Sequence, residues 1–265
     1  MHPLVNIAVS AARTAGNFIS RSLDRVDQLT VESKGRNDFV TQVDRSAEAE
    51  IIKVIRKAYP QHAVLGEETG ATGDNEVVWI VDPLDGTTNF LHGLPHFAVS
   101  IGIQVRGKLE HGVIYAPSTQ DLYIATRGSG ATLNNRKIRG SAAKELDSAL
   151  IGTGIPIKPE LLDAYMPMLK TIAGNSAGIR RAGSAALDLA YVAAGRLDGF
   201  FELGLKPWDM AAGIVLVQEA GGTVSELYGN GDPMTTGHLL AAPHKLHAQF
   251  AEALRGAAQP IVPAE

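Results

Sequence analysis

Two aspartates three positions apart follow an apolar run in the segment DPLDGTTNF, residues 82–90. Pro83 fixes one backbone angle and bends the chain, so the carboxylates of Asp82 and Asp85 can converge instead of lying along a strand. Two carboxylates at such a short distance raise each other's pKa unless a cation neutralises them. Oxygen ligands suit hard ions such as Mg²⁺ or Mn²⁺. The spacing therefore predicts a metal site at the end of the strand.

Further acids stand where loops leave strands or open helices, at Glu67, Glu68 and Asp209. One such acid taken alone is most often a cap that satisfies free backbone N–H groups. Because they recur together with Asp82 and Asp85, we favour one shared site over several separate caps.

The segment Gly86-Thr87-Thr88-Asn89 follows the aspartate pair at a predicted helix N-terminus, where backbone N–H groups bind phosphate. Carboxylates beside such a turn indicate phosphoryl transfer, in which paired cations stabilise the attacking and leaving oxygens. The chain has no Walker A loop and no G-x-G-x-x-G after a strand, which argues against a nucleotide kinase or a dehydrogenase. Hydrolysis with water as the nucleophile fits better.

The composition is that of a globular protein of 265 residues, with 45% apolar residues, 20% charged residues and a net charge of -4. This length predicts one large domain or two intimate subdomains, and the charge gives no support to nucleic-acid binding. The absence of cysteine excludes disulfides, thiolate metal sites and a cysteine nucleophile. With no signal-like N-terminus and no run of 18 apolar residues, we expect a cytoplasmic protein without a membrane partner.

The elements that must position these residues follow from periodicity and turn chemistry, which predict an α/β protein. Helices are expected at 4–23, 42–58, 161–176 with an interruption at Pro167, 183–195 and 207–222, the last with Asp209 at its start. Strands are expected at 62–68, 77–81, 97–105, 109–117, 121–128, 130–134, 149–155 and through Phe200 and Phe201, those from 97 to 134 as an antiparallel meander. We expect loops at 31–41 and 69–76, and a frayed end over 256–265.

Three motifs in this order, GEE (66–68), WIVDPLDGTTNF (79–90) and PWDMAAG (207–213), resemble the signatures of the inositol monophosphatase family. The resemblance covers about Asp38 to Gly222, and DFVTQVD (38–44) with GSAALDLAYVAAGRLDGFFE (183–202) is similar to the family's bacterial SuhB-type branch. It implies a layered αβαβα sandwich related to fructose-1,6-bisphosphatase. It also implies a single domain over 1–265, with intimate subdomains at about 1–140 and 141–265, and a homodimer.

The family's metal ligands carry over residue by residue. The resemblance implies that Glu67, Asp82 and the Leu84 carbonyl hold one cation and that Asp82, Asp85 and Asp209 hold a second, with Glu67 also able to reach a third. The expected cofactor is Mg²⁺, two or three per subunit, with Mn²⁺ as an alternative. Glu67 and Thr87 would orient the attacking water, and Asp44 would orient Thr87. Asp44 could also serve only as the acid of a helix cap, and both roles can hold together.

The substrate residues also follow from the resemblance. Phosphate would meet the N–H groups of Gly86 and Thr87, and the polyol would contact Asp85, Gly183, Ser184, Ala185, Glu202 and Asp209. The alternative for Glu202 is a solvated acid at the edge of the core. Lys206 stands where vertebrate relatives have a histidine, which leaves the ring contacts open.

Several other polar residues lie near the motifs. Lys34 roughly matches a lysine of a metal-site loop, or is a solvated loop charge. We expect His92 and His96 to be structural, and we assign no role to Asp188 or Asp198.

The resulting hypothesis is a lithium-sensitive, Mg²⁺-dependent phosphomonoesterase acting on myo-inositol 1-phosphate and related sugar or polyol phosphates. Fructose-1,6-bisphosphatases, NADP(H) phosphatases, histidinol-phosphate phosphatases and phosphoadenosine phosphate phosphatases share these motifs, so their substrates remain alternatives. SuhB-type proteins are associated with RNA polymerase and ribosomal-RNA antitermination. A non-catalytic scaffold with those partners is therefore the second hypothesis.

Overall fold

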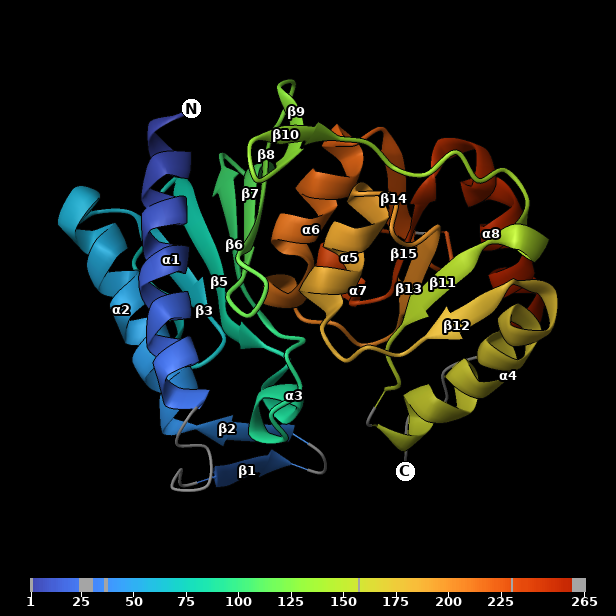
Figure 1. The fold of residues 1–265 in the computed structure, drawn as a ribbon, viewed down its shortest axis with the longest axis horizontal. Helices are drawn as coiled ribbons and strands as arrows, with labels where there is room; N and C mark the ends of the chain where they lie inside the picture. The colour runs from blue at the N-terminus through green and yellow to red at the C-terminus, as the bar shows by residue number, and fades with distance from the viewer. Residues whose placement is uncertain (1, 24–30, 36–37, 157, 230, 259–265) are drawn as a thin grey trace.

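The computed structural model describes residues 2–23, 31–35, 38–156, 158–229 and 231–258, with the side chains of 31–41 left out. Five layers stack across the molecule, helices alternating with sheets in the order αβαβα (Figure 1). The layers are the pair α1 and α2, an eight-stranded sheet, the pair α5 and α6, a five-stranded sheet, and the pair α4 and α8. The layered α/β class expected from the sequence is therefore confirmed.

The outer helix pair on the N-terminal side consists of α1 (Pro3–Leu23) and α2 (Gln42–Ala58). The α1 helix buries small and aliphatic residues at helical spacing, including Val5, Ala8, Ala12 and Ile19. They form one core with the sheet, in which Trp79 is fully buried.

The eight-stranded sheet has the order β10-β9-β8-β7-β6-β5-β3-β4. Its strands are β3 (Ala63–Gly66), β4 (Gly70–Thr72), β5 (Val77–Asp85), β6 (Ala98–Val105), β7 (Lys108–Ala116), β8 (Asp121–Thr126), β9 (Gly130–Leu133) and β10 (Arg136–Ile138). The antiparallel meander predicted for 97–134 is confirmed as β6 to β9. Only the pair β3 and β5 is parallel in this sheet, so their carboxyl ends meet at the same edge.

The middle layer consists of α5 (Ala185–Ala193) and α6 (Pro207–Glu219), and both lie between the two sheets. The α6 helix packs closely on β6 and β7 because two glycines face it. A Cβ at Gly102 would lie 2.6 Å from Cβ of Ala211, and one at Gly112 would collide with the carbonyl oxygen of Ala212. This close contact fixes α6, and with it Asp209 in its first turn, relative to the sheet.

The five-stranded sheet has the order β12-β11-β13-β15-β14. Its strands are β11 (Leu150–Thr153), β12 (Gly178–Arg180), β13 (Gly199–Glu202), β14 (Gly222–Glu226) and β15 (Leu239–Pro243). The outer helices α4 (Pro159–Asn175) and α8 (His244–Ala257) form a third core with it. Short helical segments lie at η2 (Leu146–Ser148), α3 (Thr87–Leu91) and α7 (Pro233–Thr236).

Four sequence-based expectations about the elements were wrong or incomplete. The expected loop at 31–41 forms the hairpin of β1 (Val31–Gly35) and β2 (Asp38–Thr41), and the loop at 69–76 contains β4. The α4 helix continues through Pro167, which costs a hydrogen bond but does not end it. Several elements were not expected at all, namely β10, β12, α7, β14, β15 and α8.

The expectation of a frayed end was also wrong in part, because α8 extends to Ala257, and residues 259–265 lie outside the described part of the chain. None of the described helices is long and apolar enough to cross a membrane.

Candidate active site

Glu67 and Asp82 lie side by side where the parallel pairing of β3 and β5 ends. Gly66 of β3 pairs with Val81 of β5, and the Glu67 N–H donates to the Val81 carbonyl at 3.1 Å. Asp82 is 2% exposed, and its Oδ1 accepts a hydrogen bond from the Leu84 N–H at 3.0 Å. The carboxyl edge of parallel strands is where α/β proteins commonly place ligands.

The turn between Asp82 and Asp85 is a bulge in β5. Asp82 pairs with Ser100 of β6, whereas Asp85 pairs with Ala98, so three steps along β5 match two along β6. The extra residue bends the strand and redirects its side chains. The bend expected at Pro83 is thus a β-bulge between Asp82 and Asp85, each of which pairs with a residue of β6.

Thr87 and Asp44 are in direct contact, although they come from different elements. The Thr87 hydroxyl lies 2.8 Å from Oδ1 of Asp44 and 3.1 Å from the Leu84 carbonyl. Asp44 is 1% exposed in the first turn of α2, so its carboxylate is held where it can orient that hydroxyl. Gly86, immediately before α3, has φ 98°, a left-handed conformation that favours glycine.

The N-terminus of α5 joins the same site. Oδ2 of Asp85 accepts from the Ser184 hydroxyl at 2.6 Å and from the Ala186 N–H at 2.7 Å. A Cβ at Gly86 would lie 3.3 Å from the Gly183 carbonyl, so this turn and the start of α5 are adjacent. Residues 183–185, expected at the substrate, therefore lie beside Asp85.

Asp209 and Glu202 complete the acidic cluster from the C-terminal half of the chain. Oδ2 of Asp209 accepts from the Lys206 N–H at 2.6 Å. Burial and the nearby Asp85 raise the pKa of Asp209 to about 8. Burial also raises the pKa of Glu202, and the charge of Asp209 adds to that effect.

The surrounding protein does not fully compensate the negative charge of these carboxylates. Burial raises the pKa of Asp82 well above its ordinary value, and Glu67, Asp85 and Asp209 raise it further. Burial raises the pKa of Asp85 to about 6 despite the hydrogen bond from Ser184. Divalent cations would remove this repulsion, and the donors are the oxygens that Mg²⁺ prefers.

The residues fit a hard cation by their chemistry, although the ligand set is not preformed. Among the residues that the structure describes, no three Asp, Glu or His side chains already converge as a closed ligand set. One carboxylate oxygen of each acid is held by a protein donor, namely Oδ1 in Asp82 and Oδ2 in Asp85 and Asp209.

Two supporting residues were missed in the sequence. Glu48, fully buried in α2, accepts from the N–H groups of Glu68 and Thr69 at 2.9 Å each and so fixes the segment that carries Glu67. The amide nitrogen of Asn89 donates to the carbonyls of His96 and Ala182, at 2.7 and 2.8 Å. A signal for Glu48 was available, because it falls four residues after Asp44, on the stripe that α2 buries.

The other polar residues singled out in the sequence are His92, His96, Lys206, Lys34 and Asp198. His92 is exposed, and the His96 ring packs edge-on against Tyr191 with 5.8 Å between ring centroids. The Lys206 side chain is exposed, and that of Lys34 lies outside the described residues. Asp198, which had no role assigned, accepts from the Leu150 N–H at 2.8 Å and supports β11.

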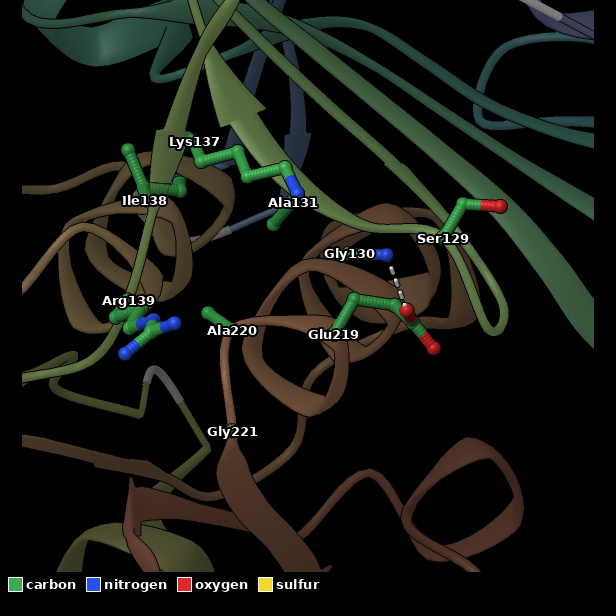
Figure 2. Close-up of a pocket in the computed structure, with 9 residues that line it drawn as sticks. All are labelled: Ser129, Gly130, Ala131, Lys137, Ile138, Arg139, Glu219, Ala220 and Gly221. Carbon is green, nitrogen blue, oxygen red and sulfur yellow. Dashed lines mark hydrogen bonds between the residues drawn. The ribbon is translucent and has the colours of Figure 1, made fainter.

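A separate pocket of about 300 Å³ lies beside Glu219, Ala220 and Gly221 at the C-terminal end of α6 (Figure 2). Glu219 lines it, and its two carboxylate oxygens accept from the N–H groups of Gly128 and Gly130 at 2.8 and 2.7 Å. Ten residues of helix separate Asp209 from Glu219, or about 15 Å. This pocket is therefore distinct from the acidic cluster.

The five layers and the clustered carboxylates near the strand ends define a class of layered α/β proteins with an acidic site. The sequence matches the Inositol monophosphatase family over residues 1–259, so the chain belongs to that family.

Similar proteins include SuhB proteins and inositol monophosphatases. The Nus factor SuhB of Pseudomonas aeruginosa is 52% identical, over 92% of this chain and 93% of the relative. The crystal structure of the extragenic suppressor protein SuhB of Bartonella henselae has a TM-score of 0.93 and 45% identity, covering 96% of this chain and 99% of that one. Inositol monophosphatase II of Staphylococcus aureus, solved with inositol monophosphate bound, has a TM-score of 0.78 and 32% identity, covering 95% of this chain and 93% of that one.

Proposed function

We propose that the protein is a Mg²⁺-dependent phosphomonoesterase that hydrolyses myo-inositol 1-phosphate and related sugar and polyol phosphates. The observation that carries this proposal is the acidic cluster at the end of β5. Burial raises the pKa of Asp82, and three nearby acids raise it further: Asp85 on the same strand, and Glu67 and Asp209 from distant parts of the sequence. Such a cluster is stable when ionised only with cations present, and phosphoryl transfer is the chemistry that paired divalent cations serve best.

The cations would be held by Glu67, Asp82, the Leu84 carbonyl, Asp85 and Asp209. When bound, Mg²⁺ supplies charge stabilisation at phosphoryl oxygens and lowers the pKa of water. The protein's own residues do the positioning. The Thr87 hydroxyl, held by Asp44, would orient the attacking water together with Glu67, and the N–H groups of Gly86 and Thr87 would contact the phosphate.

The polyol end of the substrate would lie against residues 183–185 and Glu202. The staphylococcal relative was solved with inositol monophosphate and also with 2'-AMP, which supports inositol phosphate as the first candidate without restricting the class to it. Fructose 1,6-bisphosphate and NADP(H) remain the alternatives. Lithium inhibition and a homodimer are expected on the family likeness.

A substrate panel at fixed Mg²⁺ tests this proposal. We expect the highest kcat/KM with myo-inositol 1-phosphate, and phosphate release should be lost in Asp82→Asn but retained in Asp163→Asn, an exposed acid on α4. Faster turnover of fructose 1,6-bisphosphate would overturn the substrate ranking. Absence of phosphate release from every sugar phosphate would overturn the enzyme itself.

A second candidate function is a scaffold in transcription antitermination, favoured by the Nus factor relatives at about half identity. It would involve RNA polymerase and its associated factors and would not need catalysis. The Asp82→Asn variant separates the two candidates, because a scaffold role predicts that this variant rescues the transcription phenotype of a deletion strain. Failure of the rescue by a folded variant would tie the phenotype to phosphate release.

A further inference from the structure

Asn89 of α3 joins two segments of the active site that are 93 residues apart in the sequence. Its side-chain amide nitrogen donates to the carbonyl oxygen of Ala182 at 2.8 Å and to that of His96 at 2.7 Å, and the Gly183 carbonyl oxygen lies 3.4 Å away. These neighbours can only accept, so the nitrogen of the amide must face them. Because Asn89 is 7% exposed, loss of this donor would leave buried carbonyl groups without it.

Two glycines allow the segments to approach each other closely. Gly86 has φ 98° and Gly183 has φ 88°, a left-handed conformation that favours glycine. A Cβ at Gly86 would lie 3.0 Å from the His96 carbonyl oxygen and 3.3 Å from that of Gly183. A Cβ at Gly183 would lie 3.1 Å from Nδ2 of Asn89. The two segments are therefore packed backbone against backbone, and the Asn89 amide lies against the second of them.

Each segment forms one end of the proposed substrate site. The turn after Asp85 would contact the phosphate through its backbone N–H groups, and residues 183–185 would contact the polyol. The second segment is also tied to the acidic cluster, because the Ser184 hydroxyl and the Ala186 N–H donate to Asp85. A bound substrate has to reach from one segment to the other, so their separation and orientation decide which alcohol group fits.

We propose that Asn89 is a positioning residue that determines specificity for polyol phosphates, by fixing the polyol segment (residues 182–185) against the phosphate turn (residues 86–89). This inference rests on the proposed phosphatase function and extends it to the joint between the two ends of the site. Both hydrogens of the amide nitrogen are used by backbone carbonyls, so none is left for the substrate. Asn89 therefore acts through the backbone that it holds.

The test compares two substrates that share a phosphate group but differ in hydroxyls, myo-inositol 1-phosphate and p-nitrophenyl phosphate. Asn89→Ala removes the donor without adding a charge. We expect it to lower the ratio of kcat/KM for the inositol ester to that for the aryl ester by about 10-fold, mainly through a higher KM for the inositol ester. Asn89→Asp, which turns an acceptor oxygen toward the carbonyls, should lower the ratio at least as much. Both rates come from one preparation, so the ratio does not depend on the fraction of the variant that folds.

Asn134→Ala is the control, because the side chain of Asn134 also bridges two groups, Asp121 and the Leu122 N–H. It lies in the turn between β9 and β10, at the opposite end of the molecule from α3 (Figure 1). This variant should lower the melting temperature and leave the substrate ratio unchanged.

Equal losses on both substrates in Asn89→Ala, or an unchanged ratio, would overturn the positioning role alone. A wild-type protein that hydrolyses only the aryl ester would overturn the polyol segment and this inference with it. A wild-type protein inactive on both substrates would instead overturn the proposed phosphatase function.

Discussion

The Thr87 hydroxyl donates to Oδ1 of Asp44 at 2.8 Å, a contact that joins the turn after β5 to the first turn of α2 across 43 residues of sequence. The same hydroxyl lies 3.1 Å from the Leu84 carbonyl. One small side chain therefore links a buried acid, a backbone oxygen expected to hold a cation, and the place where the water should be oriented.

Removal of this hydroxyl should impair the chemical step more than substrate binding. We expect Thr87→Val, which keeps the shape of the side chain, to lower kcat by about 10²-fold with a small change in KM, as for loss of a group that positions a proton transfer. Steady-state kinetics at saturating Mg²⁺ would measure it, and Thr87→Ser should retain most of the activity. Equal rates for the Val and Ser variants would show that the hydroxyl has no part in the reaction.

Glu48 should control metal affinity without touching the metal. It binds the N–H groups of Glu68 and Thr69, the two residues that follow Glu67, so Glu48→Gln leaves one N–H facing an amide donor. We expect the affinity for Mg²⁺ to fall by about 10-fold or more, as for other residues that support metal ligands. The free energy of unfolding should fall by about 1–3 kcal/mol.

Titration calorimetry and denaturant unfolding would measure these two effects of Glu48→Gln. Glu50→Gln is the control, since Glu50 lies on the same helix and pairs with Lys53 at the surface. Unchanged Mg²⁺ affinity in Glu48→Gln would contradict the supporting role.

The parts of the site that were predictable from sequence rest on local signals. Pro83 between two aspartates predicts a bend, and Thr41 with Asp44 predicts the start of α2, which begins at Gln42. The convergence of Glu67, Asp85 and Asp209 depends on sheet order and on the close packing of α6, which no local pattern encodes. The family resemblance supplied those positions.

The elements that were missed had either weak signals or signals that were overlooked. The segments at β1 and β4 are short and polar, and strand pairing rather than apolar alternation defines them. The α8 helix has an apolar repeat at Leu246, Phe250 and Leu254 that was present in the sequence. Asp188 was unassignable because α5 is buried all round, so its position alone cannot distinguish a core acid from a site acid.

The metal-free protein should become less stable as the pH rises from about 4 to 8. In the folded chain the pKa of Asp85 is about 6 and that of Asp209 about 8, whereas both groups ionise near 4 when unfolded. A raised folded pKa favours folding at low pH, and this contribution is lost as the pH rises through the folded values. Bound Mg²⁺ should remove the loss because it stabilises the ionised carboxylates.

The measurement for this pH effect is the difference in melting temperature with and without Mg²⁺ at each pH. Taking the difference cancels the opposite trend of buried histidines such as His96 and His238, whose lowered pKa values destabilise the folded state below about pH 6.5. We expect the difference to grow with pH, and apparent Mg²⁺ affinity to rise in parallel. A difference that is constant from pH 5.5 to 8.5 would contradict the assignment of these acids as ligands.

Glu219 should stabilise the fold without affecting catalysis. Its two oxygens bind the N–H groups of Gly128 and Gly130, which attaches the turn between β8 and β9 to the C-terminal end of α6. In Glu219→Gln one oxygen becomes an NH₂ group that faces a backbone N–H, so at least one bond is lost and a donor faces a donor. We expect the free energy of unfolding to fall by about 1–3 kcal/mol.

Because Glu219 lies at the far end of α6 from Asp209, kcat/KM of Glu219→Gln at 25 °C should match the wild type. Denaturant unfolding and kinetics on one preparation would measure both quantities, with the exposed Glu252→Gln as a control that changes neither. A loss of activity at full stability would mean that α6 transmits changes along its length to Asp209. The tight contact of α6 with Gly102 and Gly112 argues against such movement, because the helix is held against the sheet between its two ends.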